Sequence, residues 1–132
     1  MGRIVAQVEI SNPSGEGKAL TCSVFVDTGA AGMILPMAWR KRLGEFASSE
    51  TVELVLGNGK VVEGEACGPV GIQIEGFRKV FNEVIFLEME KAEGREYEPL
   101  LGYVILEQAQ AAVDMLGHRL VPVRYVDCRG LW

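Results

Sequence analysis

The chain has 132 residues, of which 48% are hydrophobic and 23% are charged, and its formal net charge is −5. This length suits one domain with its own core, so we treat residues 1–132 as a single domain. The acidic balance argues against a nucleic-acid partner held by phosphate contacts, and against a basic helix lying on a membrane.

The N-terminal segment shows no sign of a secretory signal. Residues 1–15, "MGRIVAQVEISNPSG", enter an alternating pattern at once and lack both an apolar block and a small-residue cleavage site. No apolar run approaches the roughly 20 residues that a membrane-spanning helix needs. We therefore expect a cytoplasmic protein with no membrane partner.

Short apolar or alternating segments are separated by Gly, Pro and Asn residues. This pattern predicts an all-β or mostly-β domain with one or two short helices. Pro36 is expected to open a helix in "PMAWRKRLGEF", with Trp39 and Leu43 facing the core and Gly44 near its end. A second helix is expected near 104–110, and residues 88–99 form a charged loop. The expected strands are 3–10, 19–26, 70–74, 80–87 and 120–126.

The clearest local signal is "TVELVLGNGKVVEGEACG", in which two extended segments flank Asn58 and Gly59. This pair is the one best suited to a two-residue hairpin turn with positive φ. We therefore expect a hairpin over residues 51–67, tipped by glycine.

The three cysteines, Cys22, Cys67 and Cys128, are an odd number without CxxC spacing. Neither a disulfide framework nor a metal site is expected, and the simplest interpretation is three small core residues. A Cys–His nucleophile would need His118, the only histidine, beside one of them. His118 lies in "DMLGHRL", which is typical of a hairpin turn.

Asp27 stands in an unusual place for a carboxylate. It ends the apolar run "VFV", and the chain turns apolar again a few residues later, at 33–35. A charge in buried surroundings is costly unless it is paired or neutralised. The Asp27-Thr28-Gly29 triplet alone is weak, because such an Asp often only caps a strand-to-turn connection.

Three features together resemble the retropepsin-like family of aspartic proteases, in its cellular or bacterial single-domain form. "VDTGA" is similar to the family's active-site loop, the glycine-tipped hairpin follows where the family has its flap, and "LLG" at 100–102 matches the element that threads beside the loop. The resemblance covers nearly the whole chain. It implies a closed-barrel acid protease fold that is active as a two-fold homodimer.

The resemblance also implies roles for residues, with no metal and no cofactor. Asp27, Thr28 and Gly29 would be catalytic, with the Thr28 hydroxyl bonding across the dimer axis. Ala30 lacks the hydroxyl that pepsin-like enzymes usually carry there, which implies activity at less acidic pH. The implied substrate-binding residues are Ala30, Ala31, Asn58, Gly59, Leu101 and Gly102.

Peptide hydrolysis of this kind needs two carboxyl groups, one as base and one as acid. Neither Asp114 nor Asp127 is followed by Thr-Gly, so the second carboxyl is expected to be Asp27 of another copy. Strands 3–10 and 120–126 suit an interleaved dimer sheet, unless these edges pair within one chain. Ala31 and Tyr103 replace an acidic residue and an Arg of viral enzymes, so subsite preferences are not carried over.

The sequence thus predicts a homodimeric aspartic endopeptidase that cleaves extended peptides beneath two flaps. A non-catalytic dimeric module that binds peptides with the same fold is the alternative. A third hypothesis is a structural domain whose role lies in the 88–99 loop, where only charge supports it.

Overall fold

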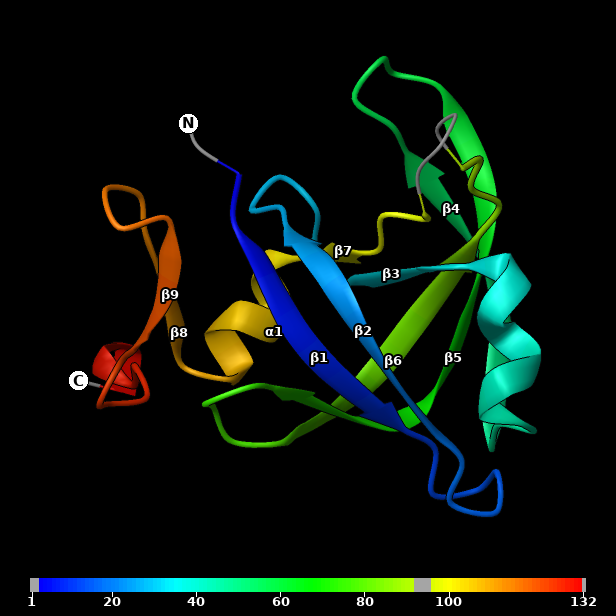
Figure 1. Cartoon of the computed structure of the whole chain (residues 1–132), viewed down its shortest axis with the longest axis horizontal. Helices are drawn as coiled ribbons and strands as arrows, with labels where there is room; N and C mark the ends of the chain where they lie inside the picture. The colour runs from blue at the N-terminus through cyan, green and yellow to red at the C-terminus, as the bar shows by residue number, and fades with distance from the viewer. Residues whose placement is uncertain (1–2, 92–95, 132) are drawn as a thin grey trace.

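The computed structural model describes residues 3–91 and 96–131, which form mostly β structure with few helical turns (Figure 1). This confirms the expected class. No helix in these two ranges has both the length and the apolar character to cross a membrane. The elements are β1 (Val5–Ser11), β2 (Ala19–Val26), β3 (Met33–Pro36), the 3-10 helix η1 (Met37–Leu43), β4 (Ser48–Val55), β5 (Val61–Ile74), β6 (Val80–Leu87), β7 (Leu100–Leu101), α1 (Tyr103–Gln108), β8 (Ala111–Asp114), β9 (Arg119–Pro122) and the 3-10 helix η2 (Arg129–Leu131).

Seven strands form one sheet in the order β1-β2-β7-β3-β6-β5-β4. An additional antiparallel pairing of β1 with β5 joins the first strand to the sixth, so six strands close into a barrel and β4 extends from β5. β8 and β9 form a separate two-stranded hairpin, which stands beside the barrel together with the C-terminal segment (Figure 1).

Alternation of apolar and polar residues places one face of each barrel strand in the core. In β1, Val8 and Ile10 are buried while Gln7 and Glu9 are exposed. The core is continuous across the barrel and includes residues from most of its strands, among them Val24, Met33, Leu35, Ile72, Phe86 and Leu101.

η1 occupies the expected helix but is tighter and shorter. It starts after Pro36, which is extended (ψ 137°), and it ends at Gly44, whose φ of 74° favours glycine. Leu43 is fully buried and Trp39 packs against the core, as expected. The buried Asn12 donates from Nδ2 to the carbonyls of Leu43 (2.7 Å) and Glu45 (2.8 Å), so the β1–β2 turn holds the end of η1.

Several expected boundaries need correction. The expected strand 3–10 runs from Val5 to Ser11, and the expected strand 70–74 is the end of a long β5. The helix expected at 104–110 covers only Tyr103–Gln108. The chain then turns at Gln110 with φ 60° and forms β8, which was not anticipated. The last strand ends at Pro122, since β9 pairs only with the four residues of β8. Of the charged 88–99 loop, residues 92–95 lie outside the described ranges.

The turn of the β4–β5 hairpin also differs from expectation. Gly59 N–H donates to the Leu56 carbonyl (2.8 Å) and Leu56 N–H to the Lys60 carbonyl (2.9 Å). The loop therefore has three residues, 57–59, in which Gly59 adopts φ 82°. Asn58 is not at positive φ but accepts a bond from Lys60 N–H on its side chain (2.9 Å). A β-turn followed by one left-handed glycine has the same Asn-Gly signature as a two-residue turn.

The N-terminal strand pairs within its own chain. β1 pairs with β2 along its whole length, and its residues 8–11 also pair with β5 on the other side. Barrel closure therefore uses both edges of β1 over residues 8–11.

Candidate active site

The loop that carries Asp27 is wound around the end of another strand. β7 lies between β2 and β3, parallel to the first and antiparallel to the second. The loop from 27 to 32 joins β2 to β3 and must therefore pass around the chain that leaves β7. Asp27 N–H donates to the Leu101 carbonyl (3.0 Å), which fixes the start of the loop on β7.

Gly102 is the residue around which this loop closes. Its N–H donates to the Gly32 carbonyl (2.9 Å), and the next two amides, of Tyr103 and Val104, donate to the carbonyls of Ala30 (2.8 Å) and Ala31 (2.9 Å). A Cβ placed on Gly102 would lie 2.5 Å from backbone atoms of Ala30, Ala31 and Gly32. Only glycine fits such a close approach of two backbones.

The Asp27 carboxylate stands at the end of β2, half-buried, beside exposed Thr28 and Gly29. Gly29 N–H donates to Asp27 Oδ1 at 2.9 Å, and Ala30 N–H donates to the Asp27 carbonyl at 3.1 Å. A Cβ on Gly29 would sit 3.1 Å from the same Oδ1, tighter than ordinary contact. The backbone therefore orients the carboxylate and leaves it accessible to a ligand.

The structure places Leu101 and Gly102 against the Asp27 loop, and Asn58 and Gly59 on a separate hairpin. Leu101 and Gly102 are buried, so they support the loop from below instead of presenting side chains to a ligand. Asn58 and Gly59 are at the exposed tip of the β4–β5 hairpin, which rises at the same end of the barrel as the Asp27 loop in Figure 1.

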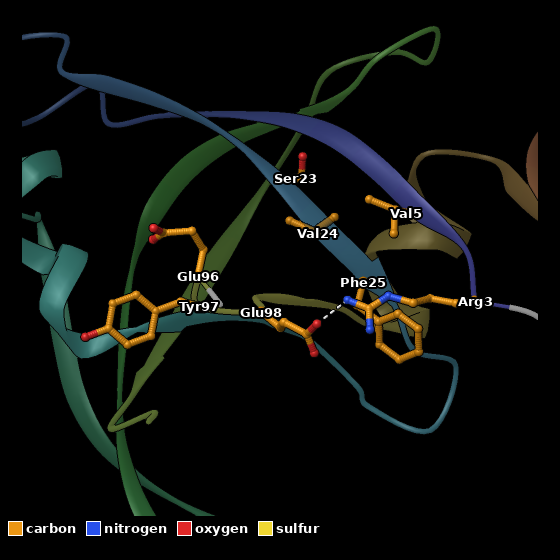
Figure 2. A pocket seen from close by; sticks show the side chains of 8 residues that line it. All are labelled: Arg3, Val5, Ser23, Val24, Phe25, Glu96, Tyr97 and Glu98. Carbon is orange, nitrogen blue, oxygen red and sulfur yellow. Dashed lines mark hydrogen bonds and ion pairs between the residues drawn. The ribbon is translucent and has the colours of Figure 1, made fainter. Parts of the chain in front are cut away.

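A cavity of about 450 Å³ opens along β2, the strand that precedes Asp27. Successive side chains of a strand alternate between faces, so Ser23 and Phe25, which both line the cavity, share one face of β2. Figure 2 shows the Arg3 guanidinium stacked over the Phe25 ring, 5.1 Å from its centroid, and paired with the Glu98 carboxylate. The complete lining is Arg3, Val5, Ser23, Val24, Phe25, Glu96, Tyr97 and Glu98.

Sequence reasoning missed this cavity. The period of two along β2 could have pointed to Ser23 and Phe25, counted back from Asp27. Arg3 and Glu98 are 95 positions apart in the chain, and the pairing of β2 with both β1 and β7 brings them together. As an exposed ion pair they add at most about 1 kcal/mol of stability.

The cysteines offer no activated nucleophile on the barrel. Burial raises the pKa of the Cys22 thiol to about 11 and also raises that of Cys67, and a raised pKa disfavours the reactive thiolate. Cys128 is exposed, which corrects the expectation of three core cysteines, because it follows the last strand and has no sheet to pack against. His118 is in the β8–β9 turn with φ 53°, as the hairpin interpretation predicted.

The other two aspartates are engaged by local partners. Asp114 Oδ1 accepts bonds from the backbone amides of Leu116 (3.1 Å) and Gly117 (2.9 Å), and Oδ2 pairs with Arg119. The Gly117 amide, followed by Arg119, lowers the pKa of Asp114. The Arg129 guanidinium lowers the pKa of Asp127 in the same way. Both carboxyls thus stay ionised and lie outside the Asp27 loop.

No protein-family model and no curated protein matches the chain. In the part of the chain that the structure describes, no three His, Cys, Asp or Glu side chains are grouped so as to hold a metal ion.

Proposed function

We propose that the protein is a homodimeric aspartic endopeptidase of the retropepsin-like type. The observation that carries the proposal is the Asp27 carboxylate, oriented by the Gly29 amide on a loop that closes around Gly102. The loop itself is fixed by backbone bonds to Leu101, Gly102 and the start of α1. The half-buried carboxylate is therefore held by its loop at an accessible surface.

The proposed reaction needs a second carboxyl group close to the first. Two carboxyls at hydrogen-bond distance cannot both ionise, so they share one proton and act together as one base and one acid. The base would take a proton from a water that attacks the peptide carbonyl, and the acid would protonate the carbonyl oxygen. When the C–N bond of the tetrahedral intermediate breaks, the carboxyl that took the water's proton would give it to the leaving amine nitrogen, and the other carboxylate would take a proton back from a hydroxyl of the intermediate. Asp114 and Asp127 are held by their own partners, so the second group is Asp27 of another copy, related by a two-fold axis.

The substrate would be an extended peptide lying across the face of β2 that carries Ser23 and Phe25. The cavity beside Phe25 is large enough for a substrate side chain, and Val5, Val24 and Phe25 in its lining are apolar. The exposed β4–β5 hairpin would cover the peptide and exclude water, as closing loops do in other enzymes.

The substitution Asp27→Asn tests this proposal, because it keeps an oxygen for the Gly29 amide and removes the ionisable group. The matched control is Asp114→Asn, which makes the same change in the β8–β9 turn. Purified proteins are incubated with a denatured polypeptide from about pH 3 to pH 7, and binding of a labelled peptide is followed by anisotropy. We expect cleavage by the wild type and the control, and a loss of at least about a hundredfold for Asp27→Asn.

Cleavage that survives Asp27→Asn removes Asp27 from the mechanism. The alternative, a dimeric peptide-binding module, predicts that the wild type and Asp27→Asn bind peptide equally and that neither cleaves it.

A further inference from the structure

One wall of the cavity along β2 holds a positive charge between a ring and a carboxylate. Arg3 Cζ lies 5.1 Å from the centroid of the Phe25 ring, and the guanidinium pairs with the Glu98 carboxylate (Figure 2). Phe25 N–H donates to the Pro99 carbonyl at 2.8 Å, so the backbone holds Phe25 next to the segment that carries Glu98. An aromatic face and a carboxylate both attract cations, so these two groups together are suited to bind one.

A second set of the same kind lies at the cavity away from Arg3. Lys91 Nζ is 5.0 Å from the centroid of the Tyr97 ring and 3.6 Å from Glu96 Oε2. The Tyr97 ring packs edge-on against Trp39, with 6.1 Å between the ring centroids and 88° between their planes, which holds it in place. Glu96 and Tyr97 both line the cavity, and Figure 2 shows them at the opposite side of the view from Arg3. A ring and a carboxylate therefore bind a cation twice around one cavity.

The rest of the cavity suits the aliphatic part of a long side chain. Val5 and Phe25 are directly opposite each other in the pairing of β1 with β2, and both line the volume of about 450 Å³. Arg and Lys side chains lay their methylene groups along apolar surface while the charged end reaches a polar group. Two of the 8 lining residues are acidic and one is basic, so the lining favours a positively charged ligand.

Arg3 is a weakly held occupant of the position between Phe25 and Glu98. It precedes β1, which begins at Val5, and the side chains of Arg3 and Glu98 are 51% and 46% exposed. Solvent screens an ion pair that is exposed to this extent, so the pair contributes little to stability. A cation on a ligand that makes further contacts of its own can therefore replace Arg3.

We propose that the cavity binds an arginine side chain of a substrate peptide, which displaces Arg3 and takes its place between Phe25 and Glu98. The inference rests on the proposed function, because it assigns the class of peptide that would lie on this face of β2. A guanidinium stacks flat on a ring and pairs with a carboxylate at the same time, whereas an ammonium is a compact, strongly hydrated charge. Arginine is therefore expected to bind better than lysine, and Arg3 acts as an internal competitor. The net charge of −5 also draws basic peptides to the chain.

The test is the binding of fluorescent peptides to the full-length Asp27→Asn variant, followed by anisotropy, so that no peptide is cleaved during the measurement. The peptides share one alanine-rich sequence and carry Arg, Lys, Leu or Glu at its centre. We expect the Arg peptide to bind at least about tenfold more tightly than the Leu peptide, and the Lys peptide to fall between them. The Lys peptide carries the same charge as the Arg peptide, so it separates stacking from the attraction of net charge.

Further substitutions are made in the same variant. Glu98→Gln removes the charge and keeps the shape, and it is expected to reduce the preference for Arg over Leu to about threefold or less. The matched control, Glu75→Gln, changes an exposed glutamate that does not line the cavity and leaves the preference unchanged. Arg3→Ala removes the internal competitor and is expected to tighten binding of the Arg peptide by about threefold to tenfold. Phe25→Leu, which keeps an apolar side chain without a ring, is the second variant if circular dichroism finds Glu98→Gln unfolded.

A Leu or Glu peptide that binds as tightly as the Arg peptide overturns the proposal, and so does a preference that Glu98→Gln leaves unchanged. Weaker binding of the Arg peptide by Arg3→Ala, or no binding of any peptide, overturns it as well. Cleavage of the same peptides by the wild type tests the hydrolase separately. An arginine preference without cleavage supports the role of the cavity and refutes the hydrolase. Cleavage without a preference for arginine overturns the role of the cavity alone.

Discussion

Gly102→Ala tests the threaded loop without reference to any activity. The added Cβ would lie 2.5 Å from three backbone atoms, whereas real Cβ atoms essentially never approach closer than 3.0 Å. The loop from Ala30 to Gly32 must therefore move by about half an ångström. Overpacking of this kind costs about 1–3 kcal/mol. Weakening the bond from Gly102 N–H to the Gly32 carbonyl adds about 1 kcal/mol. The expected loss of unfolding free energy is thus about 2–4 kcal/mol.

Urea unfolding followed by circular dichroism measures this loss. The matched control is Gly130→Ala, because a Cβ on Gly130 meets nothing within 4 Å and its φ is not left-handed. We expect the control to stay within about 0.5 kcal/mol of the wild type. If Gly102→Ala also stays within that range, the close approach of β7 to the Asp27 loop is refuted. If the hydrolase proposal is right, the shifted loop also reduces cleavage by about a hundredfold, since such chemistry tolerates little displacement.

Two further substitutions test the chemistry of the loop and the support of η1. Ala30→Thr supplies a hydroxyl that can donate to the carboxylate and favour its ionised form, so the pH–rate optimum is expected to move to lower pH by up to about one unit. An optimum that stays or rises contradicts that reasoning. Asn12→Ala leaves the carbonyls of Leu43 and Glu45 without their buried donor and is expected to lower the unfolding free energy by about 2–4 kcal/mol. Ser14→Ala keeps its backbone amide and is the control, and equal unfolding free energies for the two variants would exclude the role given to Asn12.

The candidate site was predictable to the extent that it is local. The triplet Asp27-Thr28-Gly29 ends a strand whose bounds, Ala19–Val26, were predicted correctly, because the apolar alternation there is strong. The amide bond from Gly29 to Asp27 spans two residues and follows from local turn chemistry. The wall of the cavity was not predictable, because no sequence pattern around Arg3 or Glu98 indicates that these two residues lie together.

Sequence by itself determined the β class, the position of the Asp27 loop and the glycine-tipped hairpin, because these depend on residues a few positions apart. Tertiary structure alone decided that β1 pairs on both edges over residues 8–11, that Leu101 is buried beneath the loop, and that Val104 shares a groove with Tyr125. These facts depend on which strands become neighbours when the barrel closes. Backbone hydrogen bonds do not select strand partners, because every strand offers the same donors and acceptors. The choice is set by how the apolar faces of distant strands pack together, which no short stretch of sequence specifies.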